Sequence, residues 1–120
     1  MMGKIKVYEY EKCSTCRKAL QFLEEKDVDF NRIAIVDKPP TKTELRRMLS
    51  YYDGNLKRLF NTSGQVYREM ELGKKLPKMS EGEAINLLAA NGKLVKRPFV
   101  VLKSGGLVGF KEDEWRRAEF

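Results

Sequence analysis

The feature that most constrains this chain is a Cys-x-x-Cys motif, residues 13–16, between a predicted strand and a predicted helix. Residues 4–8 alternate polar and apolar side chains and are rich in Ile, Val and Tyr, which predicts a strand. Ser14 and Thr15 are good N-cap candidates, and an amphipathic helical pattern follows them. Residues 30–36 are rich in β-branched side chains and predict a second strand. A strand, a helix and a strand of these lengths form a βαβ unit with a parallel strand pair.

The position of the motif predicts a reactive thiol at Cys13. Unpaired backbone N–H groups and the helix dipole favour an anion at the N-terminus of a helix. Lys12 and Arg17 add positive charge nearby. Both effects stabilise a thiolate, so they should lower the pKa of Cys13. Cys16 lies one turn further along, and a disulfide ring can close at this spacing if Cys13 lies just outside the helix.

Other readings of the cysteine pair are two small buried residues or half of a metal site. The chain has no His and only these two Cys, so a four-ligand zinc site of nitrogen and sulfur cannot form within one chain. We therefore expect no metal. The absence of His also excludes Cys–His and Ser–His–Asp catalysis. Redox or nucleophilic cysteine chemistry is favoured, with two buried residues as the alternative.

Length and composition limit the class of protein. The 120 residues suit one domain, residues 1–120. No apolar run is long enough to span a membrane and no signal peptide is evident, so the expected location is the cytoplasm, where close thiols stay reduced. The net charge of +7 favours an anionic partner such as an oxyanion, although a solvated basic surface would have the same charge. No nucleic-acid-binding motif is present, so no direct nucleic-acid binding is expected.

The middle of the chain predicts a mostly helical insertion, residues 41–91. It begins after Lys38-Pro39-Pro40, with a capping box of Thr41 and Glu44, and the helix runs to about Tyr52. Short helices are expected around 56–60 and 67–72, the second ending at Gly73. A last helix begins at a second capping box, Ser80 with Glu83, and closes at Asn91-Gly92.

The end of the chain predicts two more strands and a helix. Residues 97–102 form a strand that opens with Pro98, residues 104–106 a hairpin turn, and residues 107–110 the returning strand. Residues 111–117 predict the final helix, with Trp115 packed on the sheet. The fold class is therefore α/β, a four-stranded mixed sheet in the order β-α-β, helical insertion, β-β-α. A thioredoxin-like fold begins with the same strand, Cys-x-x-Cys, helix and strand.

Several segments in the same order carry a family resemblance: residues 13–19, 61–64, 67–68, 97–98 and 108–114. In these segments the sequence resembles the ArsC/Spx/YffB group of thioredoxin-like proteins, and it is most similar to the YffB-like and Spx-like members that carry Cys-x-x-Cys. The resemblance covers nearly the whole chain.

The resemblance implies arsenate-reductase-like chemistry. In the family's reductases a cysteine at the position of Cys13 attacks arsenate, and three arginines hold the oxyanion. One of these positions matches Arg97, a second falls at about Asn61 and the third near Phe110. Charge at the last two positions would have to come from other residues, for which Lys57, Arg58, Arg68 and Lys111 are candidates. The family also implies a cis peptide bond before Pro98, which would place this proline beside the cysteines.

Two functions follow as expectations. The first is a thiol oxidoreductase in which Cys13 attacks an oxyanion or a disulfide, with Arg97 as catalytic partner and Lys12, Arg17, Asn61 and Pro98 around the substrate. Its intermediate is resolved by Cys16, through a Cys13–Cys16 disulfide, or by glutathione or a glutaredoxin, and no cofactor is bound. The second is an Spx-like redox-sensing regulator that binds RNA polymerase and uses the same cysteine pair as its switch.

Overall fold

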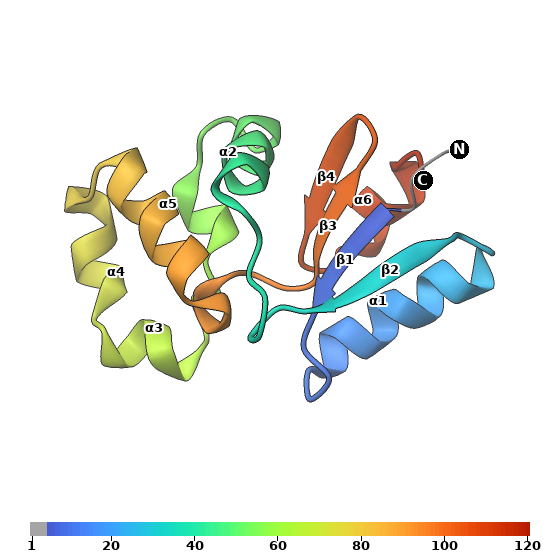
Figure 1. Ribbon diagram of the computed structural model, residues 1–120, viewed down its shortest axis with the longest axis horizontal. Coiled ribbons are helices and arrows are strands. Elements are labelled where there is room, and N and C mark those ends of the chain that lie inside the picture. Colours follow the sequence, from blue (N-terminus) through green and yellow to red (C-terminus); the bar gives the residue numbers. More distant parts are fainter. Residues whose placement is uncertain (1–4) are drawn as a thin grey trace.

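The computed structural model of the protein describes residues 5–120, and Lys4 of the first predicted strand lies outside them. Four strands form one mixed sheet in the order β2-β1-β3-β4 (Figure 1). β1 and β2 are parallel, whereas β3 is antiparallel to both β1 and β4. The sheet and its two flanking helices comprise β1 (Ile5–Glu9), α1 (Ser14–Glu25), β2 (Phe30–Ala34), β3 (Phe99–Leu102), β4 (Gly105–Val108) and α6 (Glu112–Arg117).

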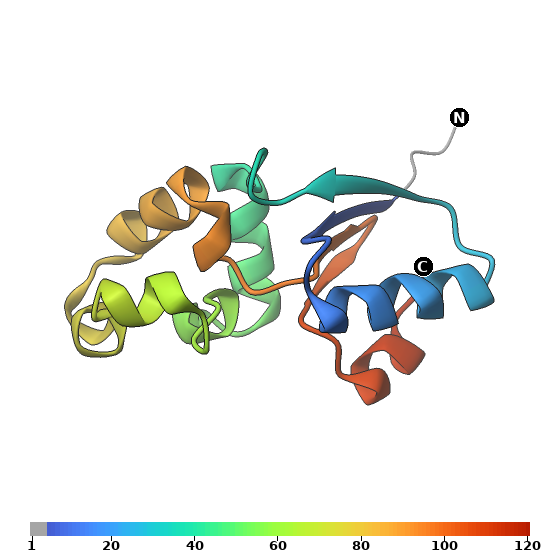
Figure 2. The ribbon, with the colours of Figure 1, turned by 90° about the horizontal axis from the view of Figure 1, so that it is seen from below.

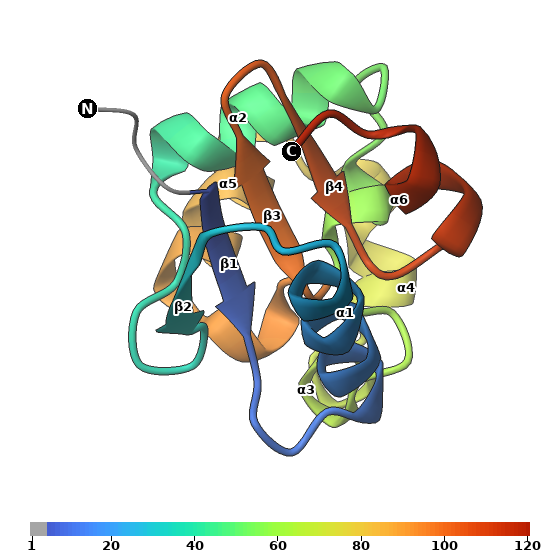
Figure 3. The ribbon, with the colours of Figure 1, turned by 90° about the vertical axis from the view of Figure 1, so that its right-hand side faces the viewer.

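The two faces of the sheet are covered differently. α1 and α6 lie together on one face of the sheet, and the helices between β2 and β3 lie on the other side, as Figures 2 and 3 show. Side chains alternate between the faces, as the period of a strand requires. Val7 and Val100 belong to the core cluster under α1 and α6, which contains Trp115 as predicted. Tyr8 and Phe99 belong to the cluster formed with the other helices.

The segment between β2 and β3 is helical, in agreement with the predicted insertion. An isolated bridge pairs Phe60 with Val95, and the N–H of Lys96 donates to the carbonyl oxygen of Leu59 at 2.8 Å. These contacts join the residues that follow η1, in the middle of the segment, to its end just before β3. None of the helices in residues 5–120 is long and apolar enough to cross a membrane. The segment comprises α2 (Lys42–Tyr51), η1 (Leu56–Leu59), α3 (Gln65–Glu69), α4 (Leu72–Lys75), η2 (Leu76–Lys78), α5 (Glu81–Ala90) and η3 (Gly92–Leu94).

Both predicted capping boxes form. Thr41 accepts the N–H of Glu44 through its side chain, and Glu44 in turn accepts the N–H of Thr41. Ser80 and Glu83 make the same reciprocal pair at the start of α5. Such pairs satisfy two N–H groups that the helix itself leaves without partners.

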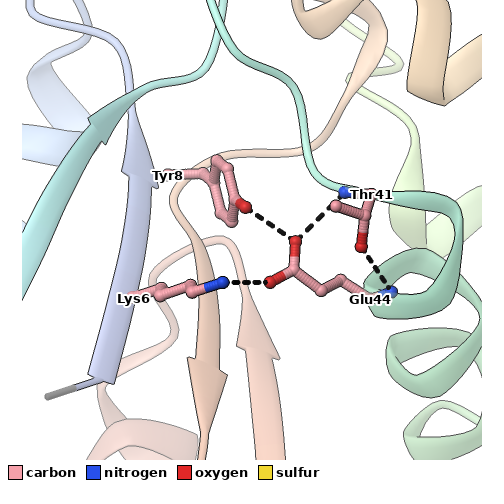
Figure 4. A network of polar contacts seen from close by, with 4 residues as sticks. All are labelled: Lys6, Tyr8, Thr41 and Glu44. Atoms are coloured by element: carbon pink, nitrogen blue, oxygen red, sulfur yellow. Dashed lines mark hydrogen bonds and ion pairs between the residues drawn. The ribbon is translucent and has the colours of Figure 1, made fainter. Parts of the chain in front are cut away.

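The Glu44 carboxylate also connects α2 to the sheet (Figure 4). Tyr8 Oη donates to Glu44 Oε1 at 2.6 Å, and Lys6 Nζ lies 3.0 Å from Glu44 Oε2. Burial, followed by the hydrogen bond to Glu44, raises the pKa of Tyr8, so its hydroxyl stays a donor. The N-terminus of α2 is thereby fixed against β1.

Two predictions about helix limits are wrong in detail. The N-cap of α1 is Cys13, which has an extended backbone, and Ser14 is already helical. No side chain caps the helix, so neither Ser14 nor Thr15 has the predicted N-cap role. The helix predicted at 67–72 is two short helices, α3 and α4. Glu71 separates them with a left-handed φ of 54°, and Gly73 lies inside α4 rather than ending a helix.

The hairpin at the end of the chain is tighter than predicted. β3 begins at Phe99, after the Arg97-Pro98 pair, and the turn comprises residues 103–104. Gly105 pairs with Leu102 inside the sheet, so it belongs to β4 and not to the turn. β4 ends at Val108 because Gly109 has a φ of +70° and leads the chain away from the sheet.

Candidate active site

Cys13 occupies the N-terminus of α1. Its backbone is extended, with φ −95° and ψ 117°, and its N–H donates to the carbonyl oxygen of Tyr10 at 2.9 Å. The first turn of α1 has no acidic residue. The free N–H groups of the first turn and the positive end of the helix dipole therefore act on the Cys13 thiol without a competing carboxylate.

Three interactions make Cys13 acidic. Partial burial is the largest single influence and raises the pKa of the thiol. The backbone N–H of Cys16, the thiol of Cys16 and the guanidinium of Arg97 all favour the thiolate, and together they hold the pKa of Cys13 below its ordinary value. Lys12 and Arg17, which the sequence analysis expected to lower this pKa, are not among these groups.

Cys16 has the opposite environment. It is fully buried, at 0% exposure, and burial raises its pKa; its hydrogen bond to Cys13 raises it further. The backbone N–H of Tyr10 acts in the other direction but does not outweigh burial. Cys16 is therefore a neutral thiol that donates toward Cys13, and both cysteines are free rather than joined in a disulfide.

Arg97 reaches the cysteines from the segment that enters β3. The peptide bond between Arg97 and Pro98 is cis, as the resemblance implied. The Arg97 guanidinium lies over the ring of Tyr10, with Cζ 4.8 Å from the ring centroid, and its Nη1 donates to the carbonyl oxygen of Lys93 at 3.4 Å. A planar guanidinium in this position can meet both the Cys13 thiolate and an anionic substrate.

A cavity of about 650 Å³ opens beside Cys13. Five basic side chains line it: Lys57, Arg58, Lys96, Arg97 and Lys111. Within residues 5–120, no Asp or Glu is among its lining residues. Arg58 also forms an ion pair with Glu114 at 3.5 Å. The cavity therefore offers a thiolate surrounded by positive charge, which favours an anion as ligand.

Residues 61–64 form one wall of this cavity. The N–H of Asn61 donates to the carbonyl oxygen of Leu94 at 2.7 Å, which fixes the loop to the segment before β3. Arg68 donates from Nη1 to the carbonyl oxygen of Ser63 at 3.0 Å. Arg68 thus contacts the backbone of the wall but does not line the cavity.

The structure brings together only part of the predicted site. Cys13, Arg97 and Asn61 line the cavity, and Cys16 lies buried behind Cys13. Lys12 and Arg17 are exposed and do not line it. Pro98 does not line it either.

The contribution of Pro98 is structural. Its carbonyl oxygen accepts the N–H of Gly109 at 2.9 Å, and Gly109 is a cavity residue. Lys57, Arg58 and Lys111, which the sequence analysis named as candidates to supply charge, do line the cavity, whereas Arg68 does not.

Two residues near the thiolate were missed by the sequence analysis. Lys96 lines the cavity, and the only signal in the sequence was its place next to Arg97. Tyr10 carries the Arg97 guanidinium on its ring, and nothing in the local pattern separates it from an ordinary residue at the end of a strand. In the part of the chain that the structure describes, no group of three His, Cys, Asp or Glu side chains could hold a metal ion.

Comparison with known proteins places this site in a family. The model that describes the ArsC family matches residues 8–118, a range that includes both cysteines, Arg97 and the cavity walls. The chain belongs to the ArsC family. This confirms the resemblance found in the sequence.

Relatives of this ArsC family member have different names. The uncharacterized protein YusI of Bacillus subtilis is 47% identical over 108 residues, 90% of this chain and 92% of YusI. The global transcriptional regulator Spx of Streptococcus mutans is 32% identical over 104 residues, 87% of this chain and 74% of Spx. The structure of a possible arsenate reductase from Streptococcus mutans is 38% identical, covers 96% of this chain and 99% of that chain, and has a TM-score of 0.86. These matches confirm the predicted thioredoxin-like, ArsC-type fold.

Proposed function

We propose that this ArsC family protein is an arsenate-reductase-like thiol oxidoreductase that uses the Cys13 thiolate as its nucleophile. The observation that carries the proposal is the position of Cys13 at the wall of a cavity lined by five basic residues, with a pKa below its ordinary value. A nucleophilic thiolate and an anion-binding wall are the two requirements for attack on an oxyanion. The structure of a possible arsenate reductase at 38% identity supports the same class of reaction.

The reaction follows from two thiols and one oxyanion. The Cys13 thiolate attacks the arsenic atom of arsenate, and an oxygen leaves as water after protonation. A second thiol then attacks Cys13 Sγ, the sulfur–arsenic bond breaks, and its electron pair reduces arsenic(V) to arsenic(III). Arsenite leaves, and Cys13 stays in a disulfide with the second thiol. Another thiol reduces this disulfide and completes the cycle.

Two sources can supply the second thiol. Cys16 is next to Cys13 and would form the internal disulfide, which a glutaredoxin or another dithiol then reduces. Glutathione could instead enter through the cavity and leave a mixed disulfide on Cys13. The high pKa of Cys16 makes it a slow nucleophile until burial is relieved, which favours an order in which Cys13 always reacts first. Both routes require reduced thiols, in keeping with the expected cytoplasmic location.

The basic side chains compensate for the arginines that the family's reductases carry at the positions of Asn61 and Phe110. Lys57, Lys96 and Lys111 line the cavity together with Arg97, so charge for an oxyanion comes from different positions of the chain. Lysine binds an oxyanion as a point charge rather than through a planar fork. Substrate binding by this protein is therefore expected to be less geometrically selective than binding by three arginines.

A coupled assay tests the proposal. NADPH consumption is followed with arsenate, glutathione, glutaredoxin and glutathione reductase, for the wild type, Cys13→Ser and Cys16→Ser. Turnover that is abolished in Cys13→Ser supports arsenate reduction. If Cys16→Ser retains turnover, glutathione is the second thiol that attacks Cys13. If Cys16→Ser loses turnover, the second thiol is Cys16. Absence of turnover from folded, reduced wild-type protein would reject arsenate as the substrate.

A second candidate function is an Spx-like regulator that binds RNA polymerase. It is favoured by the 32% identity to the regulator Spx of Streptococcus mutans and by the Cys13 and Cys16 pair. Pull-down of purified RNA polymerase under reducing and oxidising conditions tests it. Binding that depends on the redox state and is lost in Cys13→Ser would support the regulator. Equal recovery under both conditions, at the level of an unrelated basic protein, would reject it.

A further inference from the structure

The guanidinium of Arg97 has little support from polar groups. Among the described residues, no carboxylate forms an ion pair with it. The hydrogen bond that it donates to the backbone, from Nη1 to the carbonyl oxygen of Lys93, is long at 3.4 Å. The contact that spans its flat face is the ring of Tyr10, with Cζ 4.8 Å from the centroid. A cation held over an aromatic face at this distance is attracted by the ring quadrupole.

Tyr10 is itself fixed to both cysteines. Its carbonyl oxygen accepts the N–H of Cys13 at 2.9 Å, and its own N–H acts to lower the pKa of the Cys16 thiol. Its half-buried ring packs against the core cluster that contains Tyr8 and Phe99. The backbone of Tyr10 is therefore tied to the motif and its ring to the core, while Arg97 comes from a distant part of the chain.

We propose that Tyr10 is a positioning residue whose ring holds the Arg97 guanidinium beside the Cys13 sulfur. An arginine side chain has several rotatable bonds, and a charge that samples solvent is a weak partner for a thiolate. Stacking on a fixed ring limits this freedom and keeps the charge next to sulfur. The inference rests on the proposed function of Cys13 as a thiolate nucleophile.

Substitution of Tyr10 tests the proposal through the reactivity of Cys13. The rate of Cys13 alkylation by iodoacetamide is measured against pH for the wild type, Tyr10→Phe and Tyr10→Leu, with the labelled peptide identified by mass spectrometry. Tyr10→Phe keeps the ring and should titrate like the wild type. In Tyr10→Leu the midpoint of the curve of alkylation rate against pH should rise toward the pKa of an ordinary cysteine. About one pH unit below the wild-type midpoint, alkylation should be about three- to ten-fold slower. Tyr10→Met serves as the ring-free variant if Tyr10→Leu does not fold.

An Arg97→Met background separates positioning from a general structural defect. If the ring acts through Arg97, Tyr10→Leu should change the titration of Arg97→Met protein little or not at all. Three results would overturn the proposal: a wild-type titration of Cys13 in the folded ring-free variant, an equal shift in Tyr10→Phe, or an undiminished shift in the Arg97→Met background. Iodoacetamide is neutral and no oxyanion is present, so the outcome is independent of whether arsenate is the substrate.

Discussion

Cys13 immediately precedes α1 and Cys16 lies in its first turn, but the two thiols have opposite environments. Cys13 lines a basic cavity and has a lowered pKa, whereas Cys16 is 0% exposed and has a raised pKa. The contrast assigns different chemistry to the two thiols, because nucleophilicity in water requires both the thiolate form and access. Cys13 is therefore the thiol that reacts first with a reagent, and Cys16 can react only with the product formed on Cys13.

The first prediction is selective alkylation. In native protein at neutral pH, iodoacetamide should label Cys13 at least about ten-fold faster than Cys16, because Cys16 is buried and neutral. Peptide mass spectrometry of samples quenched at intervals measures both rates. In Cys16→Ser the serine hydroxyl can keep the hydrogen bond to Cys13, so Cys13 should be labelled at close to the wild-type rate. Cys13→Ser should be labelled slowly until it is unfolded. Equal labelling of both cysteines in folded protein would contradict the assigned environments.

The second prediction concerns the charge of the cavity wall. Cys13 should react faster with the anion iodoacetate, relative to neutral iodoacetamide, than an ordinary thiol does, because Lys57 and Lys111 line the cavity. Lys111→Met should lower this rate ratio about two- to five-fold at low salt. Lys103→Met removes the same charge from the β3–β4 turn, outside the cavity, and should leave the ratio unchanged. A similar fall in both variants would mean that net charge, and not the cavity, attracts anions.

The third prediction is a pH-dependent contribution of Glu44 to stability. Burial raises the pKa of this carboxyl, but hydrogen bonds from Tyr8 and Thr41 and the charge of Lys6 outweigh it and lower the pKa below its ordinary value. A lowered pKa in the folded state stabilises the fold above the unfolded pKa, and this contribution is lost as the pH falls through the folded value.

Chemical denaturation of Glu44→Gln measures this contribution. At pH 7 the free energy of unfolding should be about 1–3 kcal/mol below that of the wild type, because Tyr8 and Lys6 lose a charged partner. The difference should shrink as the pH is lowered below about 4. A difference of constant size from pH 7 to pH 3 would show that Glu44 acts through packing or neutral hydrogen bonds alone.

The fourth prediction compares two glycines. A Cβ on Gly92 would lie 1.8 Å from the carbonyl oxygen of Ile35, so Gly92→Ala must move backbone and should cost roughly 2 kcal/mol or more. Gly82 lies in α5 with nothing within 4 Å of such a Cβ, and Gly82→Ala should be stabilising by roughly 0.5 kcal/mol. Thermal unfolding distinguishes the two. A neutral Gly92→Ala would mean that the segment after α5 can shift away from Ile35 freely.

Local patterns in the sequence predicted most of the fold. The alternation around Val7, the helical pattern after Cys13 and the two capping boxes are each encoded within a few residues, and the structure contains all of them. The errors lie where backbone geometry decides. Glu71 breaks a helix in a left-handed conformation with no glycine to signal it, and Gly105 enters β4 instead of forming the turn.

The residues of the candidate site were harder to predict from the sequence than the fold was. Cys13 and Arg97 were found through a motif and a family resemblance, and both line the cavity. Lys12 was chosen because it is near Cys13 in sequence, but the structure leaves it exposed outside the cavity. Lys96 and Tyr10 depend on the approach of β3 to β1, which brings distant segments together. Sequence proximity to a motif is a poor guide to charge around it, because tertiary contacts decide which side chains meet.

The most direct test of the account is the fate of the two thiols when the reduced protein meets glutathione disulfide. Mass spectrometry of the intact protein and its peptides should show a glutathione adduct on Cys13 that accumulates in Cys16→Ser. In the wild type the adduct should be replaced by a Cys13–Cys16 disulfide, and Cys13→Ser should form neither product. A glutathione adduct on Cys16, or oxidation of Cys13→Ser at the wild-type rate, would contradict the claim that Cys13 is the attacking thiol.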